Sequence, residues 1–245
     1  MKVFASYNIK GGVGKTSTAV NLAHLSAREG RRTLLWDLDP QAAATYMFRV
    51  KPRVKGGGHA LVTGKRPLED AIRATDFGDL DLLPADFSYR NLDLDLDDAK
   101  KRTRRLRQLI GTLPDVYDVV FLDCAPSISL MSENVLHAAD TLLVPLIPAT
   151  LSLRTFEQLT TFVAETEKPR PELVAFFSLV DRRKRLHRDV IESIPRDGSR
   201  VATTEIPALS IIEQMAERQA PVTAFAPTSR AAQCYEQLWA EVRPT

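Results

Sequence analysis

Short apolar runs alternate along the chain with segments in which apolar residues recur every three or four positions. Runs of the first kind are rich in branched or aromatic side chains, which is typical of buried strands, and the second spacing gives a helix one apolar face. The expected strands are 3–7, 33–36, 80–84, 118–122, 140–145 and 173–180, and the expected helices are 18–28, 67–72, 100–113, 153–165, 186–191 and 230–242.

This alternation of strands and helices predicts an α/β fold, in which a doubly wound, mostly parallel sheet carries helices on both faces. A chain of 245 residues with 44% hydrophobic content is long enough to bury a full core, and we expect one domain over residues 1–245. Residues 46–66 are polar and glycine-rich, so we expect a surface excursion there.

The segment between the first predicted strand and the first predicted helix has the composition of a phosphate-binding loop. Its glycines let successive backbone N–H groups point inward, and a helix starting near Lys15 directs the positive end of its dipole to the same place. The spacing matches Gly-x-x-x-x-Gly-Lys-Thr when the count starts from Ile9, and Lys10 stands where a glycine usually opens the loop. The loop predicts a nucleotide site formed by Gly11, Gly12, Val13, Gly14, Lys15, Thr16 and Ser17.

Two side chains of this loop have a direct role in phosphate chemistry. We expect Lys15 to neutralise the β- and γ-phosphates and the hydroxyl of Thr16 to ligate Mg²⁺. Lys10 is a second cation that nucleotide binding alone does not require. A glycine-rich turn with two lysines is the alternative, but the order of strand, loop and helix argues against it.

Aspartates follow two of the predicted strands. Asp37 and Asp39 come directly after strand 33–36, and Asp123 ends the strand that precedes it. Ligands bind at the carboxyl ends of strands in doubly wound sheets, so these carboxylates are candidates for a metal and phosphate site, with a solvated turn as the alternative for the first two. Cys124 is expected to be a small buried residue and not a redox group.

With these residues in hand, the chain resembles the deviant Walker A ATPases of the ParA/MinD group, in which a signature lysine stands as Lys10 does here. Residues 37–41 look like the first switch of that group, and 119–127 look like its Walker B strand and second switch. The resemblance covers nearly the whole chain and is greatest to the ParA/Soj-like partition ATPases. It implies a P-loop NTPase fold and hydrolysis of ATP with Mg²⁺.

The resemblance also implies roles for individual residues. Lys10, Lys15 and Asp39 would be catalytic, with Asp39 orienting or activating the attacking water. Thr16, Asp37 and Asp123 would hold or support Mg²⁺, and Pro207 would pack on the adenine. The chain has alanine at positions 42 and 43, where the group often has glycine and asparagine.

Charge along the chain bears on nucleic-acid binding. The net charge is only +2, so any affinity for nucleic acid must come from clustered cations. A basic run at 181–189 is offset by no acidic run, and His187 is expected to be a surface neighbour of its cations. The group binds DNA non-specifically through this region, so the expected DNA contacts, with a solvated face as the alternative, are Arg182, Arg183, Lys184, Arg185 and Arg188. The second basic run, 100–107, is expected to be a solvated face partly neutralised by the aspartates of 93–98.

The leading hypothesis is a cytoplasmic, nucleoid-associated ATPase that positions or segregates a plasmid, a chromosome or a protein complex. ATP would drive formation of a homodimer, the dimer would hold DNA, and a ParB-like or other adaptor protein would trigger hydrolysis. A MinD-like regulator at the membrane is the alternative. Helix 230–242 is expected to pack on the core, so no stable membrane association is expected.

A third hypothesis is a metal-cluster carrier, which is disfavoured because Cys124 and Cys234 form no C-x-x-C pair. The two cysteines fit a reducing cytosol. No apolar run approaches a length of about 18 residues, so no membrane span is expected. The apolar run at residues 2–7 is too short for a signal peptide and glycines follow it at once, so no signal peptide is expected either. Because the first strand starts at once, we also expect no N-terminal helix-turn-helix and no operator-specific repression.

Overall fold

The computed structural model describes residues 1–98, 102–113, 115–166, 170–194 and 201–244. In this part of the chain seven strands form a sheet of order β3-β4-β2-β5-β1-β6-β7, in which every neighbouring pair is parallel except β3 with β4. The predicted fold class is confirmed. The strands are β1 (Lys2–Ser6), β2 (Thr33–Asp37), β3 (Arg73–Ala74), β4 (Leu80–Leu83), β5 (Val119–Asp123), β6 (Thr141–Leu146) and β7 (Glu172–Phe177).

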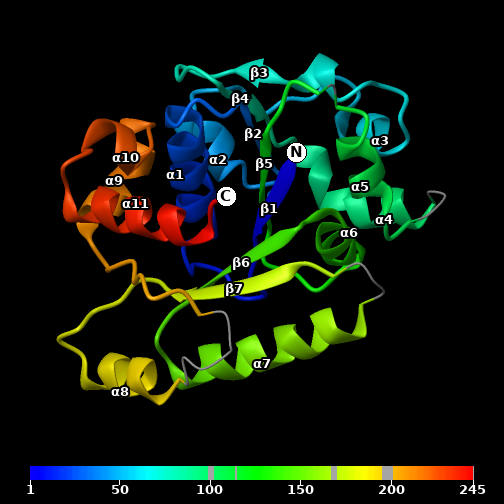
Figure 1. Cartoon of the computed structure of the whole chain (residues 1–245). Coiled ribbons are helices and arrows are strands. Elements are labelled where there is room, and N and C mark those ends of the chain that lie inside the picture. The colour runs from blue at the N-terminus through cyan, green and yellow to red at the C-terminus, as the bar shows by residue number, and fades with distance from the viewer. Residues whose placement is uncertain (99–101, 114, 167–169, 195–200, 245) are drawn as a thin grey trace.

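Helices cover both faces of the sheet (Figure 1). The helices of each face bury their apolar residues in a separate core cluster. One face carries α1 (Lys15–Arg28), α2 (Ala43–Met47), α9 (Ser210–Arg218), α10 (Val222–Phe225) and α11 (Arg230–Val242). The other carries α3 (Gly57–Val62), α4 (Leu92–Asp97), α5 (Arg105–Ile110), α6 (Leu130–Ala138), α7 (Thr150–Glu165) and α8 (Arg185–Ser193).

The side chains of each strand alternate between the two faces of the sheet and so contribute to both core clusters. Successive side chains of a strand point to opposite faces, so Phe4 and Phe121 lie under α1 and α11 while Ala5 and Leu122 lie on the other side. The rings of Phe4 and Phe121 stack with centroids 5.2 Å apart, and the ring of Trp239 lies 5.9 Å from that of Phe4. As predicted, α11 is therefore packed on the core through its apolar face.

The predicted surface excursion at 46–66 is wrong in part. There Val54 and Leu61 are buried in the core, and α3 packs against the segment around Leu92. A Cβ atom on Gly58 would lie 2.7 Å from a methyl carbon of Leu92, so the absence of a side chain at position 58 allows this close packing. The apolar run of α3 is too short to show a periodicity in the sequence.

Several element boundaries differ from the predictions. Helix 67–72 is a short 3₁₀ turn, Glu69–Ala71, and a second 3₁₀ turn, Phe87–Asn91, was not predicted. Helix 100–113 is confined to α5, and Lys100 and Lys101 lie outside the described residues. None of the helices in the described ranges combines the length and the apolar character that a membrane crossing requires.

Candidate active site

Strand register brings the predicted carboxylates to one edge of the sheet. Asp123 at the end of β5 is the partner of Ser6 on β1 and of Asp37 on β2. Both carboxylates are fully buried. The carboxyl ends of the three strands therefore meet where the chain leaves β1 to form the glycine loop, which is the usual ligand position in a doubly wound sheet.

The glycine loop has the backbone shape that its composition predicts. Gly14 is the N-cap residue of α1 and has a φ of 93°, and a Cβ atom there would lie 2.8 Å from the hydroxyl oxygen of Ser178. Asn8 links the loop to strand β6. Its amide donates to the carbonyl of Pro145 at 2.8 Å, and its side-chain carbonyl oxygen accepts from the N–H of Lys10 at 2.9 Å. Gly11 and Gly12 are exposed, so the loop backbone is accessible to a ligand.

The two lysines of the loop occupy different environments. Lys15 is 6% exposed, and its Nζ donates to the carbonyl of Lys10 at 3.0 Å. Burial lowers the pKa of Lys15, and the negative charges of Asp123 and Asp39 act against this shift. The side chain of Lys10 is exposed. One lysine is therefore held inside its own loop, while the other faces outward.

The carboxylate of Asp37 is held by protein donors. It accepts from the backbone N–H of Thr45 at 2.8 Å, from the Thr45 hydroxyl at 2.7 Å and from the N–H of Asp39 at 3.1 Å. Burial nevertheless raises the pKa of Asp37 to about 6. These bonds fix the backbone from 37 to 45, where Asp39 is half-buried and accepts from the N–H of Gln41 at 2.9 Å. Asp37 therefore supports the segment that carries Asp39.

Asp123 has no comparable support. Among the described residues, neither of its buried oxygens has a hydrogen-bond partner of ordinary geometry. The Thr16 hydroxyl is near enough to lower the pKa of Asp123, but its effect is smaller than that of burial. Burial, followed by the charge of Asp37, raises the pKa of Asp123 well above its usual range. An ionised carboxylate is costly to bury without a cation or donors. The pair Thr16 and Asp123 thus fits a magnesium ion, which would compensate this charge.

The described residues contain no group of three or more His, Cys, Asp or Glu side chains that could hold a metal by themselves. Mg²⁺ commonly takes one or two protein oxygens and completes its shell with water and substrate phosphates. The donor set at this edge fits a metal that is bound together with a nucleotide. The expected burial of Cys124 is confirmed, since that residue is 3% exposed.

Position 42 retains a turn that glycine would favour. Ala42 has a φ of 57°, the left-handed conformation that costs a non-glycine residue about 1–2 kcal/mol. The absence of glycine there does not abolish the turn, and the strain lies within the predicted first switch.

Three supporting residues were not singled out from the sequence. Asn8 and Ser178 contact the glycine loop as described above, and Tyr7 donates its hydroxyl to the carbonyl of Ser127, which lies in the predicted second switch. The hydroxyl of Ser132 donates to the same carbonyl at 2.9 Å. These contacts join segments that are far apart in the chain, so a local sequence pattern carries no signal of them.

Pro207 lines a cavity beyond the end of β7. It forms a bridge with Val180 after β7 and helps to enclose a space of about 510 Å³ with residues 180–183 and 207–209. The cavity is thus close to the turn that carries the predicted DNA contacts.

The basic turn after β7 is more neutral than its sequence indicates. Arg182 pairs with Glu205 at 2.6 Å, Arg183 pairs with Asp181 at 2.9 Å, and Arg185 lies 3.5 Å from Asp189. The fork of Arg183 lowers the pKa of Asp181 to about 2. No acidic run faces these cations, as expected, but single acids offset three of them. One acid comes from a distant segment and the other two are interspersed in the run itself.

Other residues of the turn are also engaged. Arg188 donates to the carbonyl of Arg182 at 2.7 Å, while the side chain of Lys184 pairs with no acid in the described part of the chain. His187 is 7% exposed and its Nδ1 accepts from the N–H of Asp181 at 3.1 Å, so the expected surface position is wrong. Burial lowers the pKa of His187.

The second basic run serves mainly to fix neighbouring segments. Arg105 donates to the carbonyl of Val62, and Arg107 donates to the carbonyl of His137 at 3.2 Å. Arg102 pairs with Asp97 at 2.7 Å, which agrees with partial neutralisation by the preceding aspartates.

Comparison with known proteins identifies the family. Residues 1–174 match the family described as AAA domain. The chain is 31% identical to the sporulation initiation inhibitor protein Soj of Bacillus subtilis (strain 168) over 247 residues, which cover 98% of each chain. It is 32% identical to the chromosome partitioning protein ParA of Myxococcus xanthus over 198 residues, which cover 79% of this chain and 70% of that protein.

A crystal structure of cobyrinic acid a,c-diamide synthase from Mycobacterium smegmatis with bound ADP and magnesium has a TM-score of 0.82 and 28% identity, covering 98% of this chain and 93% of that one. A fold with a glycine loop and carboxylates at one sheet edge defines the class, a P-loop ATPase. The chain belongs to the AAA domain family and, within it, to the ParA/MinD group, as the motifs indicated.

Replacing Asp123 by asparagine should stabilise the nucleotide-free protein at about pH 8, because a neutral amide takes the place of a buried, unpaired carboxylate. We expect a gain of about 1 kcal/mol or more, equivalent to about 2–4 °C in melting temperature per kcal/mol. The raised pKa means that folding takes up a proton, so the penalty grows as the pH rises through that pKa. Thermal unfolding should therefore show a smaller gain at about pH 5.

The matched control for this variant is Asp76→Asn, which alters an exposed carboxylate and should change the melting temperature little. A melting temperature of Asp123→Asn at or below that of the wild type at both pH values would show that groups within the protein already compensate Asp123.

Proposed function

We propose that this chain is a nucleotide-driven positioning ATPase, a single domain over residues 1–245 that binds ATP with Mg²⁺ and forms a homodimer in that state. The dimer holds DNA without sequence preference and releases it when a ParB-like or other adaptor protein triggers hydrolysis. The observation that carries the proposal is the buried, unpaired carboxylate of Asp123 beside Thr16 and Lys15. Lys15 and Thr16 offset the raised pKa of Asp123 only in part, and magnesium bound with a nucleotide would supply further positive charge.

The chain's own residues divide the work of hydrolysis. Backbone N–H groups of 11–16 and the dipole of α1 bind the phosphates, and Lys15 neutralises them within the loop. Thr16 and Asp123 would hold the magnesium ion, which would supply positive charge to offset the charge that develops on the phosphoryl oxygens. Asp39, held by the segment that Asp37 fixes, orients the attacking water.

Lys10 completes the site from the second subunit. Lys15 is held within its own loop, so the outward position of Lys10 suits a contact with the phosphates of the facing subunit. A cation supplied in trans stabilises charge in the transition state, as an arginine finger does in other P-loop enzymes. Hydrolysis then depends on dimerisation, which gives an adaptor protein a step to control.

DNA binding by the basic turn requires an exchange of partners. Arg182, Arg183 and Arg185 are paired with acids, so a DNA phosphate must compete with a carboxylate for each of them. Lys184 and Arg188 add positive charge without an acidic side-chain partner among the described residues. We infer weak, salt-sensitive binding, with a dissociation constant on the order of 10⁻⁴ to 10⁻⁶ M at physiological salt.

The relatives support the positioning role, because ParA of Myxococcus xanthus is named for chromosome partitioning. We place the protein in the cytoplasm on the nucleoid. The MinD-like alternative would use an amphipathic helix on the membrane. In α11 the apolar residues Tyr235, Leu238 and Trp239 are buried against the sheet, which makes that helix unsuitable as an anchor.

Asp39→Ala should bind ATP with near wild-type affinity and lose hydrolysis by about 10²- to 10⁴-fold, because it removes the group that positions the water. Nucleotide affinity and turnover are measured separately. Asp76→Ala, which removes an exposed carboxylate outside the site, is the control and should retain turnover. Wild-type turnover in Asp39→Ala would show that Asp39 does not position the attacking water.

Reversing Arg182, Arg183 and Arg185 to glutamate should abolish ATP-dependent binding to random-sequence duplex DNA. Neutralising one of them should flatten the slope of log K against log salt by about 0.9 if that residue contacts a phosphate. The control reverses Arg49, Arg66 and Arg73, which changes the net charge equally on another surface. If the first variant binds DNA as the control does, the basic turn is only a solvated face.

A further inference from the structure

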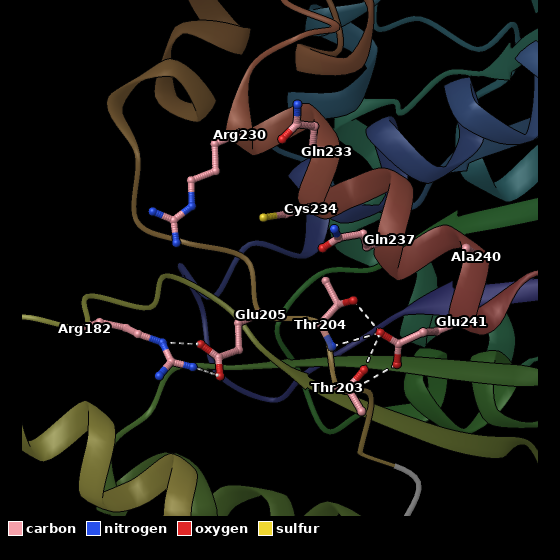
Figure 2. A pocket seen from close by; sticks show the side chains of 10 residues that line it. All are labelled: Arg182, Thr203, Thr204, Glu205, Arg230, Gln233, Cys234, Gln237, Ala240 and Glu241. Atoms are coloured by element: carbon pink, nitrogen blue, oxygen red, sulfur yellow. Dashed lines mark hydrogen bonds and ion pairs between the residues drawn. The ribbon is translucent and has the colours of Figure 1, made fainter.

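A polar groove runs beside the basic turn, between α11 and the extended residues 203–205. It encloses about 660 Å³, and Figure 2 shows Arg230, Cys234 and Gln237 projecting from α11 toward the other wall. These three positions are spaced by four and three residues, so they lie along one face of the helix. We call this cavity the α11 groove.

The acidic residues of the α11 groove are already engaged. Glu205 accepts both bonds of the Arg182 guanidinium, at 2.6 and 3.1 Å. Glu241 accepts from the N–H groups of Thr203 at 2.7 Å and Thr204 at 2.9 Å and from both hydroxyls, which lowers its pKa (Figure 2). Both carboxylates therefore hold the walls together and are satisfied in doing so.

The donors of the groove are not consumed in this way. Arg230 hydrogen-bonds the neighbouring Cys234 thiol but pairs with no acidic side chain in the described ranges, and the exposed Gln237 amide has no hydrogen bond there. Arg230 also stands in the first turn of α11, which contains no acidic residue, and a cation there opposes the helix dipole. The charge of Arg230 at the N-terminus of α11 thus destabilises the helix, and no acid among the described residues pairs with this charge. A guanidinium beside amide donors is suited to a phosphate group.

The groove is continuous with the surface proposed for DNA. Arg182 belongs to the basic turn and also lines the groove, and Arg182, Glu205 and Arg230 line both the groove and the 510 Å³ cavity beside Pro207. We propose that the α11 groove receives the phosphodiester backbone of the DNA, with Arg230 as a phosphate contact and Gln237 as a neutral donor. This inference rests on the proposed function.

Cys234 provides a probe inside the groove. It is half-buried there, while Cys124 is buried, so alkylation can be followed at one site with the other as an internal check that the chain stays folded. The rate of alkylation of Cys234 is measured by mass spectrometry on the ATP-bound protein. The three arms are no addition, random-sequence duplex DNA, and inorganic phosphate with excess free nucleotide.

We expect DNA to slow alkylation of Cys234 by about tenfold or more, and free phosphate and nucleotide to leave the rate unchanged. Arg230→Gln should weaken DNA binding by about tenfold, as expected for loss of one hydrogen-bonded charge, and flatten the salt slope by about 0.9. Arg154→Gln, which alters an exposed arginine of α7 that pairs with no acid in the described residues, is the matched control and should do neither. Gln237→Ala should weaken binding without changing the slope.

The outcomes separate this inference from the proposed function. If the wild type binds DNA while Cys234 is alkylated at an unchanged rate and Arg230→Gln binds normally, DNA does not enter the groove and the inference fails alone. Equal protection by phosphate or free nucleotide would make the groove a site for small phosphates and overturn the inference. If the wild type does not bind DNA at all, the proposed function and the inference both fail.

Discussion

The site depends on the buried carboxylate of Asp123, whose oxygens have no hydrogen-bond partner of ordinary geometry among the described residues. Strand register places it beside Asp37 at the edge of the sheet, where both are fully buried. Protein donors satisfy Asp37, but within the described residues they leave Asp123 unpaired. The glycine loop, the dipole of α1 and the Lys15 ammonium converge on this edge, so the protein supplies most of a charge-balanced site. In the proposed function, the nucleotide and its metal supply the rest.

Much of this edge could be predicted from the sequence, because the pattern that marks a buried strand also marks where it ends. Asp37 and Asp123 each end an apolar run, and Gly14 and Lys15 begin the first helix, so their convergence follows from a parallel sheet. Asn8 could not be foreseen, since its bond to the Pro145 carbonyl depends on which strands become neighbours. The burial of α3 was missed for a related reason, because its partners lie in other segments of the chain.

The basic turn shows a different limit of sequence reasoning. A run of arginines indicates clustered charge, but their ion pairs depend on side-chain direction and on residues elsewhere. Glu205 reaches Arg182 from another segment, and Asp181 binds the arginine two positions after it. The net field of the turn is therefore smaller than its composition suggests. In the proposed function, DNA binding is an exchange of carboxylate for phosphate. Cations that pair with no acid in the described part of the chain, such as Arg230, then gain importance.

In the proposed function two subunits build each hydrolytic site. Lys10 of one subunit acts on the phosphates that Lys15 of the other binds, beside the magnesium ion that Thr16 and Asp123 would hold. Mixing Lys10→Ala with Asp39→Ala subunits tests this arrangement most directly, because the heterodimer has one site in which every group is intact. We expect the mixture to recover part of the ATPase activity that neither variant has alone. Activity that never exceeds the sum of the two variants, or full activity of Lys10→Ala as a monomer, would contradict it.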